Sequence, residues 1–325
     1  MAATKEVLTD LSPVIKLYTD GTVDRLMSSP YVPPSPLPDD SATGVSTRDA
    51  VISPTVSARL HLPKLAAGQK LPILVYYHAG GFCIGSAFSL LDHRYMNTIS
   101  AAAAALAVSV DYRLAPEHPL PAAYDDAWDA LNWVCSHAVA VAGSGHPKSQ
   151  NTDQWISDHG DFSRLFIAGD SAGGNIAHHM ALRAGSDSLP GNVKIRGAIL
   201  SHPYFLMNSE SEENWKLRFL ERMWRMVWPA AGGGIDSPMI NPVADGAPDL
   251  SGLGCSRIQI CVSEKDALRD GGITYAEKVK SSGWKGEIVT VQIDGEDHCF
   301  QLYDPHTDNA CKLITKIASF ISKLE

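Results

Sequence analysis

Five consecutive residues in the middle of the chain have the pattern of a serine nucleophile. They form the G-x-S-x-G pentapeptide Gly169-Asp170-Ser171-Ala172-Gly173, between the apolar run LFIA and the helical pattern AGGNIAHHMALR. A serine on such a strand-to-helix turn projects its hydroxyl above a sheet, at the positive end of a helix, and the flanking glycines leave room where a Cβ would clash. The position predicts that Ser171 is a nucleophile. The alternative is a serine that only caps the helix.

A serine hydroxyl needs an adjacent base, and this arrangement places an acid and then a histidine later in the chain. His298 alone among the 12 histidines follows a late apolar run, at residues 288–293, and His306 lies eight residues further on. The preceding apolar run, at residues 258–262, leads into Ser-Glu-Lys-Asp266. We predict that Asp266 orients His298. Asp270 is expected to cap the next helix, and Glu264 is the weaker rival.

A glycine-rich turn, HAGGF at residues 78–82, follows another apolar run. Its exposed backbone N–H groups can stabilise the oxyanion that develops when a serine attacks an acyl carbon, together with the N–H of Ala172. A plain strand-to-loop turn is the alternative. Two further clusters have structural interpretations. The charges of DYRLAPEH at residues 111–118 are expected to pair among themselves, and the adjacent residues His178 and His179 diverge on a helix and make a poor metal pair.

The elements that must position these residues alternate along the chain. Short, nearly continuous apolar runs predict buried parallel strands at residues 71–77, 106–110, 165–168, 193–200, 258–262 and 288–293. Helical patterns lie between or after them, at residues 121–135, 172–183, 272–280 and 309–324. This alternation predicts an α/β fold with a mostly parallel central sheet and helices on both faces. The candidate loops then meet at the carboxyl edge of that sheet.

Two segments interrupt this alternation. Residues 1–40 form an N-terminal attachment, in which residues 8–19 are expected to be a short helix or an extended segment before a proline-rich stretch. Residues from about 204 to 245 contain a Trp- and Met-rich helix candidate and are expected to be a cap inserted above the sheet. The apolar residues of the cap either pack it onto the core or line a pocket. We expect a single domain spanning residues 1–325.

The bulk properties exclude several classes of protein. A formal net charge of -9 argues against nucleic acid and anionic membrane surfaces as partners, because both demand clustered Lys and Arg. Six scattered cysteines without a CxxC pair favour neither a zinc site nor a disulfide framework. No segment approaches the roughly 18 apolar residues of a membrane span, and the N-terminus does not resemble a targeting peptide. We therefore expect a cytoplasmic protein.

Taken together, HAGGF, DYRLAPEHPLPAAYDDA, GDSAGGN, EKDALRD and EDHCF resemble the hormone-sensitive-lipase-like carboxylesterases. SPVIKLYTDGTVDRL and PMINPVADGAPDLSGLGCSRI make the chain similar to the plant carboxylesterases in particular. The resemblance implies an α/β-hydrolase fold and hydrolysis of small-molecule carboxylic esters without a cofactor or metal. It implies a catalytic triad of Ser171, Asp266 and His298, oxyanion donors at Gly80, Gly81 and Ala172, and a substrate pocket covered by the N-terminal segment and the cap.

The sequence departs from the family's loop of histidine and three glycines at one position, where Ala79 replaces the first glycine. Because the donors in the family are the second and third glycines, we expect activity to be retained with slightly altered loop geometry. The family also contains a hydroxyisoflavanone dehydratase, alkaloid cyclases and a gibberellin receptor that lacks the triad histidine. A lyase, dehydratase or cyclase is therefore the alternative to an esterase, and a receptor is less favoured because His298 is present. The sequence does not indicate an oligomeric state.

Overall fold

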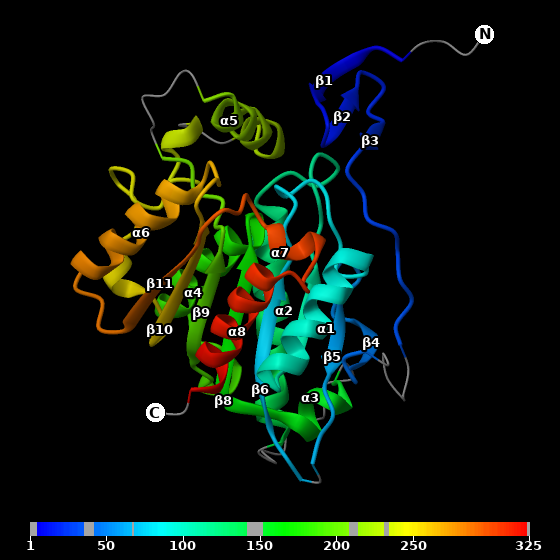
Figure 1. Ribbon diagram of the computed structural model, residues 1–325, viewed down its shortest axis with the longest axis vertical. Helices are drawn as coiled ribbons and strands as arrows, with labels where there is room; N and C mark the ends of the chain where they lie inside the picture. Colours follow the sequence, from blue (N-terminus) through cyan, green and yellow to red (C-terminus); the bar gives the residue numbers. More distant parts are fainter. Residues whose placement is uncertain are drawn as a thin grey trace.

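The computed structural model describes residues 5–35, 42–66, 68–141, 152–207, 214–230 and 234–323. A central sheet runs through the molecule with helices packed against it, and α5 and the N-terminal strands stand above one end of the sheet (Figure 1). Parts of the two predicted attachments, residues 1–4, 36–40, 208–213 and 231–233, lie outside the described residues.

Eight strands of the described chain form the central sheet, in the order β11-β10-β9-β8-β6-β7-β5-β4. Their bounds are β4 (Ser46–Val51), β5 (Ser57–Leu62), β6 (Leu71–Tyr77), β7 (Leu106–Asp111), β8 (Gly160–Asp170), β9 (Ile195–Ser201), β10 (Arg257–Ser263) and β11 (Glu287–Ile293). The six strands from β11 to β7 are parallel, whereas β5 runs antiparallel to both β4 and β7. The predicted α/β fold with a mostly parallel central sheet is confirmed.

Helices cover both faces of this sheet. The described helices are α1 (Leu90–Ala103), α2 (Ala122–Val141), α3 (Gln154–His159), α4 (Ala172–Ser186), α5 (Trp215–Val227), α6 (Arg269–Ser281), α7 (Phe300–Tyr303) and α8 (Asp308–Ser322). Side chains of α2, α4 and α6 belong to one buried cluster, and those of α1, α7 and α8 belong to a second. Strand β6 divides its side chains between the two clusters, with Val75 in the first and Leu74 in the second. This is the alternation that a strand buried on both faces requires.

The N-terminal segment is extended rather than helical in its described part. Strands β1 (Val7–Leu11), β2 (Ile15–Tyr18) and β3 (Val23–Arg25) form a separate three-stranded antiparallel sheet. Between β2 and β3, the turn at Gly21 uses a positive φ of 82°, which glycine adopts without a Cβ penalty. This sheet lies beside α5 at the upper end of the molecule in Figure 1.

Helix α5 is the Trp- and Met-rich helix expected in the cap. The side chain of Asn214 caps it by accepting hydrogen bonds from the N–H groups of Lys216 and Leu217. Trp224 is fully buried and donates from Nε1 to the carbonyl of Gly234, whereas Trp215 is exposed. No helix of the described chain is long and apolar enough to cross a membrane.

Candidate active site

Ser171 lies in a strained turn between β8 and α4. Its backbone has φ 55° and ψ -115°, outside the region that L-residues ordinarily occupy. The neighbouring glycines are sterically required, because a Cβ at Gly169 would lie 2.1 Å from the carbonyl oxygen of Gly173. A Cβ at Gly173 would lie 1.9 Å from the carbonyl oxygen of Tyr77. The side chain of Ser171 makes no helix-capping hydrogen bond, so its hydroxyl is free for another partner.

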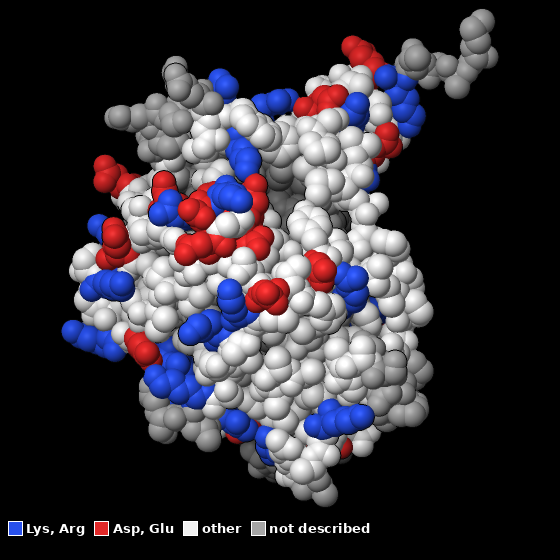
Figure 2. All heavy atoms as spheres, in the orientation of Figure 1, with Lys and Arg blue, Asp and Glu red and all other residues white. Residues whose placement is uncertain are grey.

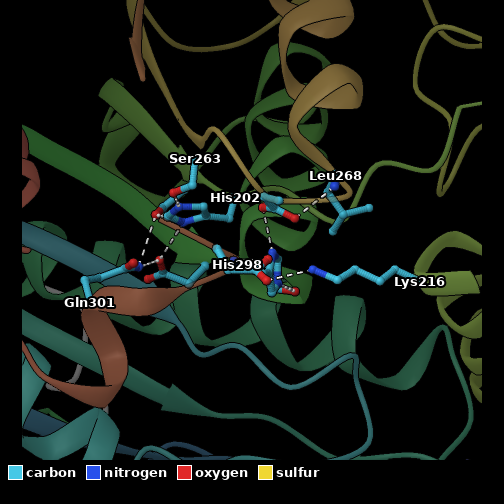
Figure 3. Close-up of polar contacts among 11 residues, drawn as sticks. His202, Lys216, Ser263, Leu268, His298 and Gln301 are labelled. Atoms are coloured by element: carbon cyan, nitrogen blue, oxygen red, sulfur yellow. Dashed lines mark hydrogen bonds and ion pairs between the residues drawn. The ribbon is translucent and has the colours of Figure 1, made fainter. Parts of the chain in front are cut away.

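That partner is His298, which comes from the loop after β11. The Nε2 atom of His298 lies 2.9 Å from the Oγ atom of Ser171, and its Nδ1 atom lies 2.8 Å from Oδ2 of Asp266. An ionised carboxylate only accepts, so Nδ1–H donates to Asp266 and Nε2 is left to accept the proton of the serine hydroxyl. Figure 3 shows His298 between the pair His202 and Ser263 on one side and Lys216 on the other.

Asp266 is held in place by the backbone that follows β10. Its Oδ1 atom accepts a hydrogen bond of 2.9 Å from the N–H of Leu268, which leaves Oδ2 for His298. Burial alone would raise the pKa of the Asp266 carboxyl, but His298 and the hydrogen bonds outweigh it and the pKa lies below its ordinary value. Asp266 is therefore a buried carboxylate that stays ionised.

The same pair sets the basicity of His298. Burial lowers the pKa of the imidazole, and the nearby carboxylates, Asp266 first among them, more than compensate. The net result is a pKa above the ordinary value of 6.5. A histidine that is both oriented and made more basic by a carboxylate is suited to accept a proton from a serine hydroxyl.

The glycine-rich loop after β6 lies against Ser171. Gly80 and Gly81 have φ values of 123° and 56°, and both line the same cavity as Ser171. A Cβ at Gly80 would lie 2.0 Å from the carbonyl oxygen of Ile84, so only glycine fits there. Ala79 also lines the cavity and does not require a positive φ. The third expected donor, Ala172, begins α4, where N–H groups lack intrahelical acceptors.

Above these residues lies a cavity of about 440 Å³. Three segments that are far apart in the sequence share its lining: the N-terminal segment (Val14, Leu26, Met27, Ser28, Ser29), helix α5 (Phe219, Leu220, Met223) and the loops of the sheet edge (among them Ser171 and His298). Most of the lining side chains are apolar. In Figure 2 the surface is hollowed between the region of α5 and the N-terminal strands.

Two polar anchors fix these covering segments close to the candidate loops. Arg25 of β3 donates to both carboxylate oxygens of Glu117, at 2.9 and 2.6 Å, and to the carbonyl of Cys83 at 2.8 Å. Lys216 of α5 contacts Asp297, the residue before His298, at 2.7 Å. Both attached segments are therefore tied directly to loops that carry the candidate site.

A buried polar network lies behind Ser171 and was not anticipated from the sequence. Asp170 accepts hydrogen bonds from Tyr76 and Gln301, at 2.9 and 2.5 Å. His202, which directly follows β9, bonds to Ser201 and Ser263 and packs edge-to-face against His298 with ring centroids 5.8 Å apart. The position of His202 at the end of a strand on the candidate edge was the available signal.

Part of this network has metal-ligand chemistry. Among the described residues, Asp170, His202 and Cys299 bring their ligand atoms within 4.8 Å of one another. Both ring nitrogens of His202 are already hydrogen-bonded, and burial raises the pKa of the Cys299 thiol well above its ordinary value, which opposes the thiolate that a metal needs. The cluster is better explained as part of the scaffold.

The alternatives to Asp266 and His298 lie outside the hydrogen-bonded chain that begins at Ser171. Glu264 accepts a hydrogen bond of 2.7 Å from the N–H of Gly295 and so joins the two candidate loops. The expectation that Asp270 caps α6 was wrong, because the helix begins at Arg269, so that Asp270 lies inside its first turn, and the Asp270 side chain is 87% exposed. His306 is exposed, and it is not among the residues that line the cavity.

Residues 111–118 and the pair His178 and His179 have structural roles, but the expected pairing within residues 111–118 was wrong. The charges at residues 111–118 do not pair among themselves, because their partners come from other segments of the chain. Asp111 accepts from Ser86, and Arg113 pairs with Asp126 at 2.6 Å. His178 and His179 bond to different groups, the hydroxyl of Tyr275 and the carbonyl of Met239.

Comparisons with known proteins agree with this architecture. A family model described as the alpha/beta hydrolase fold matches residues 74–302. The 2-hydroxyisoflavanone dehydratase of Glycyrrhiza echinata is 51% identical over 98% of this chain and 97% of that protein. Probable carboxylesterase 1 of Arabidopsis thaliana is 40% identical over 98% of both chains. The structure of esterase LipW from Mycobacterium marinum superposes with a TM-score of 0.71 at 28% identity, over 87% of this chain and 82% of that one.

The chain therefore belongs to the α/β-hydrolase family and is an enzyme of that family. Within it, the full-length similarity to plant carboxylesterases places the chain in the hormone-sensitive-lipase-like group that contains them.

Proposed function

We propose that the protein is a carboxylic ester hydrolase that acts on small-molecule esters through an acyl-enzyme on Ser171. The observation that carries the proposal is the continuous hydrogen-bonded chain from Ser171 to His298 to Asp266, with distances of 2.9 and 2.8 Å. It lies at the floor of a largely apolar cavity, and each chemical step uses side chains and backbone groups of this chain together with water.

In the first step, Oγ of Ser171 bonds to the ester carbonyl carbon while Nε2 of His298 takes the hydroxyl proton. The carbonyl π electrons move to the oxygen, and the N–H groups of Gly80, Gly81 and Ala172 stabilise the oxyanion. One such donor typically contributes about 3 kcal/mol to transition-state stabilisation. The ionised Asp266 stabilises the imidazolium that forms.

In the second step, the oxyanion re-forms the carbonyl and the alkoxy C–O bond breaks. His298 gives its proton to the leaving alcohol, and an acyl-Ser171 ester remains. Water then attacks the acyl carbon and passes a proton to His298. When the tetrahedral intermediate collapses, Ser171 leaves with that proton and the carboxylic acid is released.

The covering segments decide which esters reach Ser171. The described parts of residues 1–40 and of the insertion at about 204–245 line the cavity, which supports a lid and cap over a small-molecule substrate within one domain. The cytoplasmic location stays a prediction from the sequence.

The hydrolase is tested by covalent labelling with a fluorophosphonate probe and by turnover of short-chain nitrophenyl esters. Wild-type protein is expected to be labelled and active, and Ser171→Ala to lose both. Ser186→Ala, at the exposed end of α4, is the matched control and should behave as wild type. Absence of labelling in the wild-type protein would contradict the proposal and favour a binding-only receptor.

An elimination reaction is the second candidate, because a relative 51% identical over nearly the whole chain is named a dehydratase. In that reaction His298 removes a proton from a carbon next to a carbonyl held by the oxyanion loop and gives it to a hydroxyl group on the neighbouring carbon. The C–O bond of that hydroxyl breaks, water leaves and a C=C bond forms. Nitrophenyl ester turnover alone does not separate the two candidates. Identifying products after incubation with plant extracts does, because hydrolysis yields an acid and an alcohol, whereas elimination yields an alkene and water.

A further inference from the structure

An acidic side chain forms part of the wall of the cavity above Ser171. Asp92 lies in the first turn of α1, and it lines the cavity together with Ser171 and His298. It is 93% buried, since only 7% of its surface is exposed. Buried carboxyl groups are rare in proteins unless they are paired or have a role that requires them.

Capping of α1 does not account for this carboxyl. The N–H of Asp92 donates to the hydroxyl of Ser89 at 3.3 Å, and the N–H of Ser89 is satisfied by the carbonyl of Ser86 at 3.0 Å. Both capping hydrogen bonds therefore use backbone groups and the Ser89 hydroxyl. The carboxyl only receives the Ser89 hydroxyl proton on Oδ2, at 2.7 Å.

The other oxygen of the carboxyl is left over. The Oδ1 atom of Asp92 is buried and accepts no hydrogen bond from the described residues. An unpaired buried acceptor costs free energy, so such an atom calls for a partner. Asp92 lines the cavity, but Oδ1 itself has almost no exposed surface, so a small rotation of the carboxyl is what brings this oxygen to a donor on a ligand there.

The surroundings favour a donor from outside the protein. Among the described residues that line the cavity there is no lysine or arginine. The pKa of the Asp92 carboxyl is raised to about 6, mainly by burial. His78 acts in the opposite direction, and the nearby carboxylates Asp170 and Asp111 add to the rise. The other cavity residues from this part of the chain are the apolar Ile84 and Leu91, Gly85, and Ser89, whose hydroxyl already donates to Asp92. A ligand that satisfies this wall is apolar over most of its surface and carries one hydrogen-bond donor.

We infer that Asp92 is a substrate-recognition residue that accepts a hydrogen bond from a hydroxyl or a protonated amine on the non-reacting part of the ester. This assignment rests on the proposed function, since it concerns the same cavity. The substrate class is then an ester with a mainly apolar body and one donor group, rather than a plain alkyl or aryl ester.

The test measures binding without turnover, in the Ser171→Ala protein. Three ligands of matched shape are compared by calorimetry: 3-phenylpropylamine, 3-phenylpropanol and 3-phenylpropyl methyl ether, which lacks a donor. The amine, the alcohol or both are expected to bind about tenfold or more tightly than the ether, as a hydrogen bond to a charged group predicts. Asp92→Leu in the same background should remove this preference.

Asp92→Asn separates the two donors and keeps the shape of the side chain. A neutral amide oxygen still accepts from a hydroxyl but no longer attracts a cation, so a preference for the alcohol should survive and a preference for the amine should be lost. Asp161→Asn, which removes one carboxylate at the start of β8, is the matched control and should change neither preference. Equal affinities for all three ligands, or an unchanged preference in Asp92→Leu, would overturn the assignment. Failure of the hydrolase proposal shows separately, as absent probe labelling in the wild-type protein.

Discussion

The candidate residues are positioned by different kinds of local structure. Ser171 is held by a strained backbone between two glycines that tolerate no Cβ, and this constraint is written into the pentapeptide itself. Asp266 and His298 each follow a strand end, so their position could be predicted from apolar runs. Asp92 could not be predicted, because it lies in a helix that the sequence pattern did not indicate and its burial depends on residues far away in the sequence.

The choice between Asp266 and Asp270 can be decided by a pair of variants. Asp266→Asn should lower kcat/KM for nitrophenyl esters by about 10⁴-fold, because an amide no longer fixes the imidazole tautomer or stabilises the imidazolium. Asp270→Asn should leave the rate unchanged, since its side chain is 87% exposed. Steady-state kinetics checks both. A rate near wild type in Asp266→Asn would contradict the assignment and bring Glu264 back as the orienting group.

The oxyanion loop predicts opposite outcomes at adjacent positions. Ala79→Gly restores three glycines but should change kcat/KM by less than about threefold and destabilise the protein by about 0.5–1 kcal/mol, because the unfolded chain gains freedom. Gly80→Ala should reduce activity strongly, since its Cβ would lie 2.0 Å from the carbonyl oxygen of Ile84. Denaturant unfolding and ester kinetics measure the two effects. A large gain in activity for Ala79→Gly would show that the alanine distorts the loop.

The pKa of His298 gives a pH dependence with a definite sign. Only the neutral imidazole accepts a proton, so kcat/KM should rise with pH through a midpoint above 6.5. Asp297 is one of the carboxylates that raise this pKa, and replacing it with asparagine should move the midpoint to lower pH. Asp294→Asn is the control, because Asp294 is not among those carboxylates. A midpoint that moves upward in Asp297→Asn would contradict the electrostatic account.

At the scale of elements, the strands and helices that could be predicted from the sequence are the ones whose buried faces are apolar. All six expected parallel strands and all four expected helices are present, with shifted ends. Strand β5 and helix α1 were not predicted, because their buried surfaces contain polar residues. Arg59 of β5 is fully buried by pairing with Asp49, and α1 buries Asp92, His93 and Asn97. Long-range pairing makes this polar burial possible, and no local pattern reports it.

Helix α5 is tied to the loop before His298 by an exposed ion pair. Exposed pairs contribute about 1 kcal/mol or less, so Lys216→Met should leave global unfolding nearly unchanged. The helix itself should open more often, because Lys216 is its link to Asp297. Hydrogen exchange of the α5 amides is the measurement, with Lys280→Met on α6 as control. Unchanged exchange in α5 would mean that the helix is held without Lys216, by packing of Met223 and Trp224 and by its other hydrogen bonds.

At the scale of the whole molecule, the cavity is assembled from segments that are far apart in the sequence. It has walls from the N-terminal segment, α5 and the sheet-edge loops. Composition and periodicity indicated that residues 1–40 and about 204–245 lie outside the alternating strands and helices of the core. How closely they approach Ser171 depends on contacts such as Arg25 with Glu117, between residues 92 positions apart. For this reason the fold and the reacting groups were predictable, whereas the cavity's shape was not.

The contact of Arg25 supplies a test of the N-terminal segment as a lid. Arg25 bonds to Glu117 and to the carbonyls of Cys83 and Ala115, so Arg25→Met removes every one of these hydrogen bonds at once. If the lid is docked for only part of the time, the apparent affinity falls by the same fraction. KM for bulky aryl esters should then rise by roughly threefold or more while kcat changes less. Arg164→Met, at the opposite end of the sheet, is the matched control. Equal kinetics in both variants would show that β1–β3 cover the cavity without help from Arg25, held by contacts such as Arg222 of α5 with the carbonyl of Asp10.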